Sequence, residues 1–133
     1  MFFRIHADNG VPVYEQVVRQ ITFAIARGAL RPGEMIPSVR QLARQLAINP
    51  NTVARAYRQL QDQQIIESVR GTGMQVRQEA LPRCRAERLS VISQRFAAAI
   101  EEARQSQLSD EEIRQLVEQT LAANGGTTNR VTQ

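Results

Sequence analysis

The chain has 133 residues, a formal net charge of +4 and no lysine, so all seventeen basic residues are arginine. The missing lysine excludes Schiff-base enzymes, pyridoxal-phosphate enzymes and P-loop NTPases, each of which needs one. With one histidine, His6, and one cysteine, Cys84, the chain lacks the residues for most transition-metal sites, and we expect neither a metal nor a cofactor. No apolar run is long enough for a membrane span and no signal peptide is visible, which favours a cytoplasmic protein without a membrane partner.

The charge is distributed unevenly along the chain. Residues 1–78 hold ten arginines and five acids, whereas residues 79–133 hold seven arginines and eight acids. Between Met35 and Gln61 there are four arginines and no acid. A charged stretch is usually a solvated face, but a stretch of one sign within helices indicates a surface that binds a polyanion.

In chain order, a first helix is expected from Pro12, where apolar residues begin to recur at helical spacing. The loop RPGEMIP follows. Ser38 then caps a second helix, and Gln41 three residues later completes a capping box. After the turn AIN, Asn49 is expected to cap a third helix and Pro50 to occupy its first position.

The third helix has two different faces. Its apolar stripe consists of Val53, Ala56, Tyr57 and Leu60. Asn51, Arg55, Arg58 and Asp62 fall on the opposite face, so the two short helices form a helix-turn-helix whose second helix is polar outward. We assign Asn51, Arg55 and Arg58 to the major groove, where asparagine pairs with adenine and arginine with guanine. Arg40, Thr52 and the N-terminus of the third helix are expected to hold phosphates.

A β-hairpin is expected next, because the β-rich runs IIESV and MQV are joined by RGTG. The glycines supply the positive φ angles of its tip. Helix-turn-helix and hairpin together predict a winged helix over residues 1–78, in a chain that is mainly α with a small β-hairpin. Arg70 stands at the tip of the wing, placed to enter a minor groove.

The remainder is expected to be helical. Residues 79–88 are interpreted as a linker, residues 89–123 as a dimerisation or effector segment, and residues 124–133 as a disordered tail. The first helix of this segment carries an apolar seam of Leu89, Ile92, Phe96, Ala99, Ile100 and Ala103. The second, with a capping box of Ser109 and Glu112, carries a face that includes Ile113, Leu116, Val117 and Leu121.

Two helices alone cannot bury both of these stripes. Either they pair with the same hairpin of a second chain, or they pack back on the winged helix of their own chain. We favour the homodimer, because DNA-reading proteins usually bind two half-sites.

Residues 37–76, PSVRQLARQLAINPNTVARAYRQLQDQQIIESVRGTGMQV, resemble the DNA-binding domain of GntR-type bacterial transcriptional regulators, and VPVYEQVVRQI near the start resembles the YtrA-type subfamily. The resemblance implies a homodimeric repressor on a pseudo-palindromic operator, often that of a transporter operon. By position it implies a DNA contact at Arg40 and wing contacts at Arg70 and Gly71, to which we add Thr72. It also implies base and phosphate contacts at the entry of the recognition helix, formed by Asn49, Pro50, Asn51 and Thr52.

Two positions depart from the family pattern. Ala54 stands where some relatives carry arginine, so that base contact is absent or passes to Arg55. Gln64 stands at the exit of the third helix, where glycine is common. A left-handed glutamine would be strained by about 1 kcal/mol, and the alternative is that the helix continues through it.

A protein-interaction module that binds an acidic partner is the alternative function, and an enzyme ranks below both. Amides and a hydroxyl at the mouth of a helix suit base edges better than a protein surface. The sequence does not identify an effector, and a small ligand at the dimer interface and a purely concentration-driven switch both stay open.

Overall fold

The computed structural model describes residue 5, residues 10–71 and residues 73–132, with side chains described as far as Gly125. Predictions about His6 and Thr72 therefore lie outside the described residues. The chain forms two compact units, Met1–Ser90 and Val91–Gln133. Its architecture is mainly helical with one small antiparallel sheet, as the sequence predicts.

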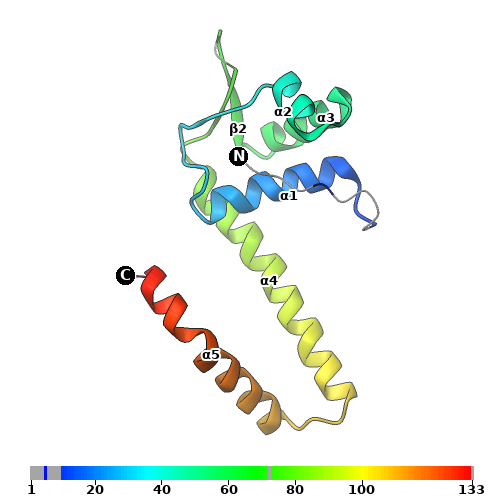
Figure 1. Cartoon of the computed structure of the whole chain (residues 1–133), viewed down its shortest axis with the longest axis vertical. Coiled ribbons are helices and arrows are strands. Elements are labelled where there is room, and N and C mark those ends of the chain that lie inside the picture. The colour runs from blue at the N-terminus through cyan, green and yellow to red at the C-terminus, as the bar shows by residue number, and fades with distance from the viewer. Residues whose placement is uncertain (1–4, 6–9, 72, 133) are drawn as a thin grey trace. The chain divides into compact units, whose positions relative to one another are not determined.

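The first unit is a winged helix. It contains α1 (Val13–Ala26), β1 (Met35–Ile36), α2 (Val39–Leu46), α3 (Pro50–Asp62), β2 (Ile66–Val69), β3 (Gly73–Val76) and the start of α4 (Ala80–Gln105). Helix α3 packs against both α1 and α2 and also contacts β2, so it lies at the centre of the unit. Figure 1 shows the three helices gathered together, with the hairpin beside them.

The predicted apolar stripes form the core of this unit. All four stripe residues of α3 are buried, and Val17, Ile21 and Ile25 of α1 are completely buried against them. The predicted caps are also confirmed. The Ser38 hydroxyl accepts a hydrogen bond from the Gln41 backbone N–H, and the Gln41 side chain accepts one from the Ser38 N–H. Two backbone N–H groups at the start of α2 that have no partner within the helix are thereby satisfied.

The sheet has one more strand than the sequence predicts. Its order is β1-β3-β2, with both pairs antiparallel. Strand β1 pairs Met35 with Gln75 and Ile36 with Met74, and it lies within the segment that was expected to be a loop. Two residues are too few to show the alternation of a strand, so only pairing with β3 defines β1.

Several helices end at a left-handed residue that is not glycine. Gln64 has φ 61°, and the N–H groups of Gln64 and Ile65 donate to carbonyls in the last turn of α3. The same pattern of backbone hydrogen bonds follows α2 at Ala47 (φ 56°) and α4 at Gln107 (φ 71°). Of the two alternatives that the sequence left for Gln64, the structure therefore has the strained turn and not the longer helix.

The segment predicted as a linker, residues 79–88, is helical from Ala80 onward. Ala80 and Cys84 are completely buried in the core of the first unit. The linker interpretation was therefore wrong about the local structure. Pro82 was part of a connector-like run, but it stands in the first turn of α4, where a helix needs no backbone N–H.

The second unit contains the rest of α4 and α5 (Asp110–Thr132). The predicted capping box at its turn is confirmed, because the Ser109 hydroxyl accepts from the Glu112 N–H and the Glu112 carboxylate accepts from the Ser109 N–H. Helix α5 continues to Thr132, which differs from the disordered tail expected over residues 124–133. Among the described side chains of this unit, none is buried.

Candidate nucleic-acid interface

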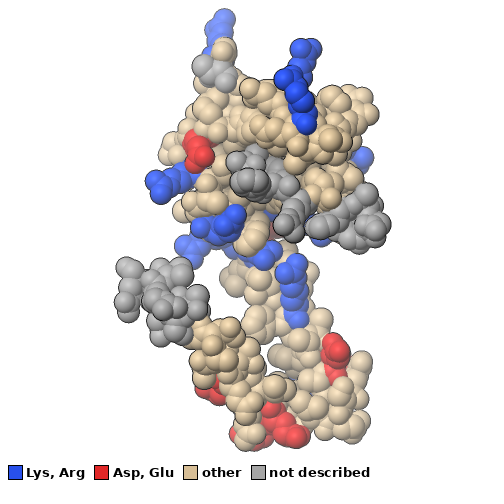
Figure 2. Space-filling model, viewed as in Figure 1, with Lys and Arg blue, Asp and Glu red and all other residues tan. Residues whose placement is uncertain are grey.

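The surface over α2 and α3 is predominantly basic, and its one acid, Asp62, stands at the last residue of α3. Arg40 and Arg44 of α2 and Arg55 and Arg58 of α3 are all exposed, and no acid lies between Met35 and Gln61. Figure 2 shows basic side chains projecting from this surface and from the wing, whereas acidic side chains gather near the turn between α4 and α5. This part of the first unit is therefore suited to a polyanion.

The N-terminus of α3 is capped within the protein. The Asn51 N–H donates to the Asn49 side-chain oxygen at 2.8 Å, and the Thr52 N–H donates to the Asn49 carbonyl at 3.0 Å. Pro50 has no N–H to offer. Phosphate binding by the first backbone N–H groups, which the sequence suggested, is therefore not favoured. The exposed Asn51 and half-buried Thr52 side chains remain available at this end.

The orientation of α3 is fixed by a buried tyrosine. The Tyr57 hydroxyl donates a 2.6 Å hydrogen bond to the carbonyl of Pro37, just before the cap of α2. Burial raises the pKa of Tyr57 well above its usual range, so the phenol keeps its proton and stays a donor. The contact links the core face of α3 to the entrance of α2, and sequence reasoning, which placed Tyr57 in the apolar stripe, did not find it.

The two outward arginines of α3 have different surroundings. The guanidinium carbon of Arg55 lies over the ring of Tyr14, 3.8 Å from its centroid, although Tyr14 belongs to α1. No such aromatic contact exists for Arg58 within the described part of the chain. The sequence analysis assigned Arg55 to the major groove and did not predict its contact with Tyr14, because nothing in the spacing relates residues on two different helices.

The wing places its predicted contacts in solvent. Arg70 and Gly71 are exposed at the turn between β2 and β3, and Gly71 has φ 79°, a conformation that favours glycine. Below the tip, the Gln75 amide donates to the Glu67 carboxylate at 3.0 Å across the two strands. The hairpin is thus held together beneath an exposed tip.

Phe23, which lies off the apolar stripe of α1, has cationic neighbours. The guanidinium carbon of Arg88 lies 3.9 Å from the centroid of its ring, and that of Arg27 lies 5.4 Å away. The contact with Arg88 adds to the buried Cys84 in fastening the start of α4 to the first unit. The ring of Phe23 is therefore contacted by two cations of its own chain.

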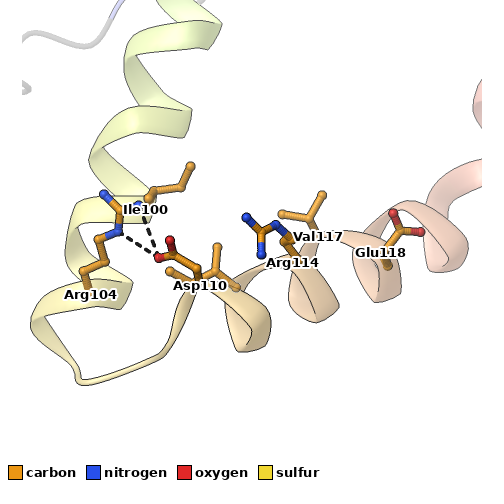
Figure 3. Close-up of a pocket in the computed structure, with 7 residues that line it drawn as sticks. Ile100, Arg104, Asp110, Arg114, Val117 and Glu118 are labelled. Atoms are coloured by element: carbon orange, nitrogen blue, oxygen red, sulfur yellow. Dashed lines mark hydrogen bonds and ion pairs between the residues drawn. The ribbon is translucent and has the colours of Figure 1, made fainter.

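The second unit contains a shallow hollow of about 320 Å³ between α4 and α5. Its lining consists of Ile100, Arg104, Asp110, Ile113, Arg114, Val117 and Glu118 (Figure 3). Asp110 accepts hydrogen bonds from the Arg104 guanidinium at 3.3 Å, and Arg114 pairs with Glu111 at 3.7 Å. Because both arginines already have carboxylate partners, the hollow does not single out an effector.

The whole chain resembles known regulators. Residues 13–76 match the family described as bacterial regulatory proteins, gntR family. The chain is 30% identical to the HTH-type transcriptional repressor YtrA of Bacillus subtilis (strain 168) over 127 residues, which cover 95% of this chain and 98% of the relative.

Two solved structures have a similar fold. A transcriptional regulator from Oenococcus oeni has a TM-score of 0.77 at 30% identity, covering 90% of this chain and 99% of that chain. YtrA from Sulfolobus acidocaldarius, a GntR-family transcription factor, has a TM-score of 0.57 at 35% identity, covering 74% and 99%. Among the described residues no helix is long and apolar enough to cross a membrane.

Proposed function

Because the chain belongs to the GntR family, a family of DNA-binding transcriptional regulators and not of enzymes, we propose that it acts as a homodimeric repressor on a pseudo-palindromic operator. The observation that carries this proposal is the exposed surface of α2 and α3, which presents four arginines and a single acid, Asp62, at the last residue of α3. The relative from Bacillus subtilis is itself named a repressor, which supports the sign of regulation. The family resemblance points to a transporter operon as the target.

Within the interface, each side chain is proposed to have one of two roles. Asn51, Arg55 and Arg58 read base edges in the major groove, where their amide and guanidinium groups match adenine and guanine. Arg40 and Thr52 contact phosphates and set the register of the helix. The remaining contacts, at the cap and the wing, come from Asn49, Arg70, Gly71 and Thr72.

A homodimer is supported by the apolar surface of the second unit. Phe96 of α4 is 58% exposed and Leu121 of α5 is 62% exposed, and Leu116 and Val117 are exposed beside them. Several large apolar side chains exposed on one small unit favour an interaction site. We propose that the same hairpin of a second chain covers it, through Leu89, Ile92, Phe96, Ala99, Ile100, Ala103, Ile113, Leu116, Val117 and Leu121. The two recognition helices would then meet successive turns of one operator.

The DNA-binding proposal is tested by titrating the purified protein against its own upstream region and against a random duplex, in a series of salt concentrations. We expect the operator to bind more tightly than the random duplex, and both affinities to fall steeply with salt as counterions are released. Removing the guanidinium with Arg58→Ala should weaken operator binding by about 1–3 kcal/mol. If neither duplex binds and an acidic protein does, the alternative of a protein-interaction module is correct.

The dimer is tested separately by sedimentation of the wild type and of Phe96→Glu, with Gln94→Glu as a control on the exposed opposite face of the same helix. The wild type and the control should sediment as dimers, and Phe96→Glu as a monomer that binds a single half-site weakly. A wild type that stays monomeric at operator-binding concentrations would contradict the proposed assembly.

A regulator of this kind must reach the chromosome, so we place it in the cytoplasm. An effector would act by changing the spacing of the two DNA-binding units, because a dimer fits only one half-site separation. Crystals with and without the effector that have the same separation would contradict this mechanism. Without an effector, the concentration of the dimer alone sets occupancy of the operator.

A further inference from the structure

One contact in the first unit joins two helices, α1 and α3. The exposed basic surface lies over α2 and α3, and α1 is not part of it. Tyr14 lies in the first turn of α1 and is half-buried against the core, and the Arg55 guanidinium rests on its ring at 3.8 Å. This distance is well inside the ~6 Å range of a cation–π interaction. The ring is anchored by the core, whereas the arginine is exposed, so the tyrosine is the fixed member of the pair.

The contact restricts Arg55 without using up its hydrogen bonds. A solvent-exposed arginine has many rotamers and loses most of them when it binds, which weakens binding. Stacking involves the face of the guanidinium, whereas its N–H donors point outward in the plane of the group. Among the described residues, Arg55 makes no hydrogen bond or ion pair, so its donors can meet two acceptors on another molecule.

Arg58 provides a natural comparison. It lies on the same outward face of α3 and is exposed like Arg55, but it has no aromatic neighbour in the described part of the structure. Both residues carry the same charge on the same helix. If Tyr14 influences DNA binding through this contact, its influence should depend on the presence of Arg55 and should not depend on the presence of Arg58.

We propose that Tyr14 is a positioning residue for DNA binding, which holds the Arg55 guanidinium in the orientation in which it contacts the operator. This inference rests on the proposed function. The partner is a pair of oxygen or nitrogen acceptors on DNA, which both a guanine edge and a phosphate group provide. Tyr14 contributes its ring, and its hydroxyl is not required.

The proposal is tested by a double-mutant cycle on operator affinity. Tyr14→Leu removes the ring and should weaken binding about two- to fivefold, as expected for an exposed cation–π contact. Tyr14→Phe keeps the ring and should bind like the wild type. In an Arg55→Ala background Tyr14→Leu should have no further effect, whereas in an Arg58→Ala background it should cost the same factor as in the wild type.

The cycle separates positioning from folding, because a loss of stability would persist when Arg55 is absent. Equal losses from Tyr14→Leu with and without Arg55, or a Tyr14→Phe variant as weak as Tyr14→Leu, would overturn the proposal. If the wild type bound no DNA at all, the proposed function would fail instead, so the two failures are distinct.

The same variants identify the DNA group that Arg55 meets. If Arg55→Ala lowers the preference for the operator over a random duplex, the partner is a base edge. If it weakens both duplexes equally and reduces the salt slope by about one, the partner is a phosphate. Either result is consistent with positioning by Tyr14, provided that the cycle shows coupling.

Discussion

The recognition helix and the C-terminal hairpin carry the same kind of apolar periodicity, yet they end in opposite environments. In α3 the stripe is buried, and Val53 and Leu60 are completely inaccessible to solvent. In the second unit the corresponding residues face solvent, with Phe96 58% and Leu121 62% exposed. The difference cannot arise from the spacing of the residues, which is helical in both.

The difference arises from the number of helices and strands that each unit packs against an apolar stripe. In the first unit α3 has α1 on one side, α2 on another and the sheet beyond, so one face is enclosed from several directions. The second unit has two helices, and a single pair leaves much of each stripe uncovered. A periodic pattern thus determines which side of a helix is apolar, whereas the number of surrounding elements determines whether that side is buried.

The largest change in stability is expected from one of two matched substitutions that test this contrast, one in each unit. Leu60→Ala should lower the free energy of unfolding by about 2–5 kcal/mol at every protein concentration, because the cavity lies in the core of one chain. Leu121→Ala should cost little in dilute solution and more as the concentration rises, because in the proposed dimer a second chain buries that side chain. Urea unfolding at two protein concentrations measures both. A Leu121→Ala variant as unstable as Leu60→Ala in dilute solution would show that its own chain covers it.

A second prediction concerns α4, which buries Ala80 and Cys84 in its first turns and none of its later described residues. Burial, and less strongly the charge of Glu87, raises the pKa of the Cys84 thiol to about 11. Because the folded state favours the protonated thiol, this contribution to stability is complete below about pH 9 and is lost as the pH rises through about 11.

The absence of lysine makes this alkaline transition visible, since few other groups titrate there. We expect a loss on the order of 2 kcal/mol between these pH values, and a flatter curve for Cys84→Ala. The pKa of Tyr57 is also raised by burial, so its ionisation lowers the stability of the folded state as well, at higher pH. Denaturant unfolding at several alkaline pH values provides the measurement, and identical curves for the two proteins would show that Cys84 has no part in it.

The smallest expected effect uses two glutamines in the same strained conformation. Gln64 follows α3 in the first unit and Gln107 follows α4 in the second, with φ of 61° and 71°. Glycine relieves the strain of a left-handed residue, so Gln64→Gly should raise the stability of the first unit by roughly 0.5–1 kcal/mol. Gln107→Gly should instead strengthen the proposed dimer, because its turn belongs to the hairpin of α4 and α5. Melting and sedimentation of both variants would test this, and interchangeable effects would contradict the division into two units.

Residues close together in the chain determined much of this protein by themselves. The caps at Ser38, Asn49 and Ser109, the stripe of α3 and the glycine-rich tip of the wing all appear where the sequence predicts them. These features depend on spacings of two to four residues, which the backbone geometry of a helix or a hairpin fixes.

Contacts between distant residues were decided only by the tertiary structure. Strand β1 exists because β3 pairs with it, and the first turns of α4 bury Ala80 and Cys84 because the winged helix covers these two side chains. Likewise, Tyr14 meets Arg55 only because α1 and α3 are packed together. A sequence specifies its local geometry directly, but which side chains meet across two elements depends on how those elements pack.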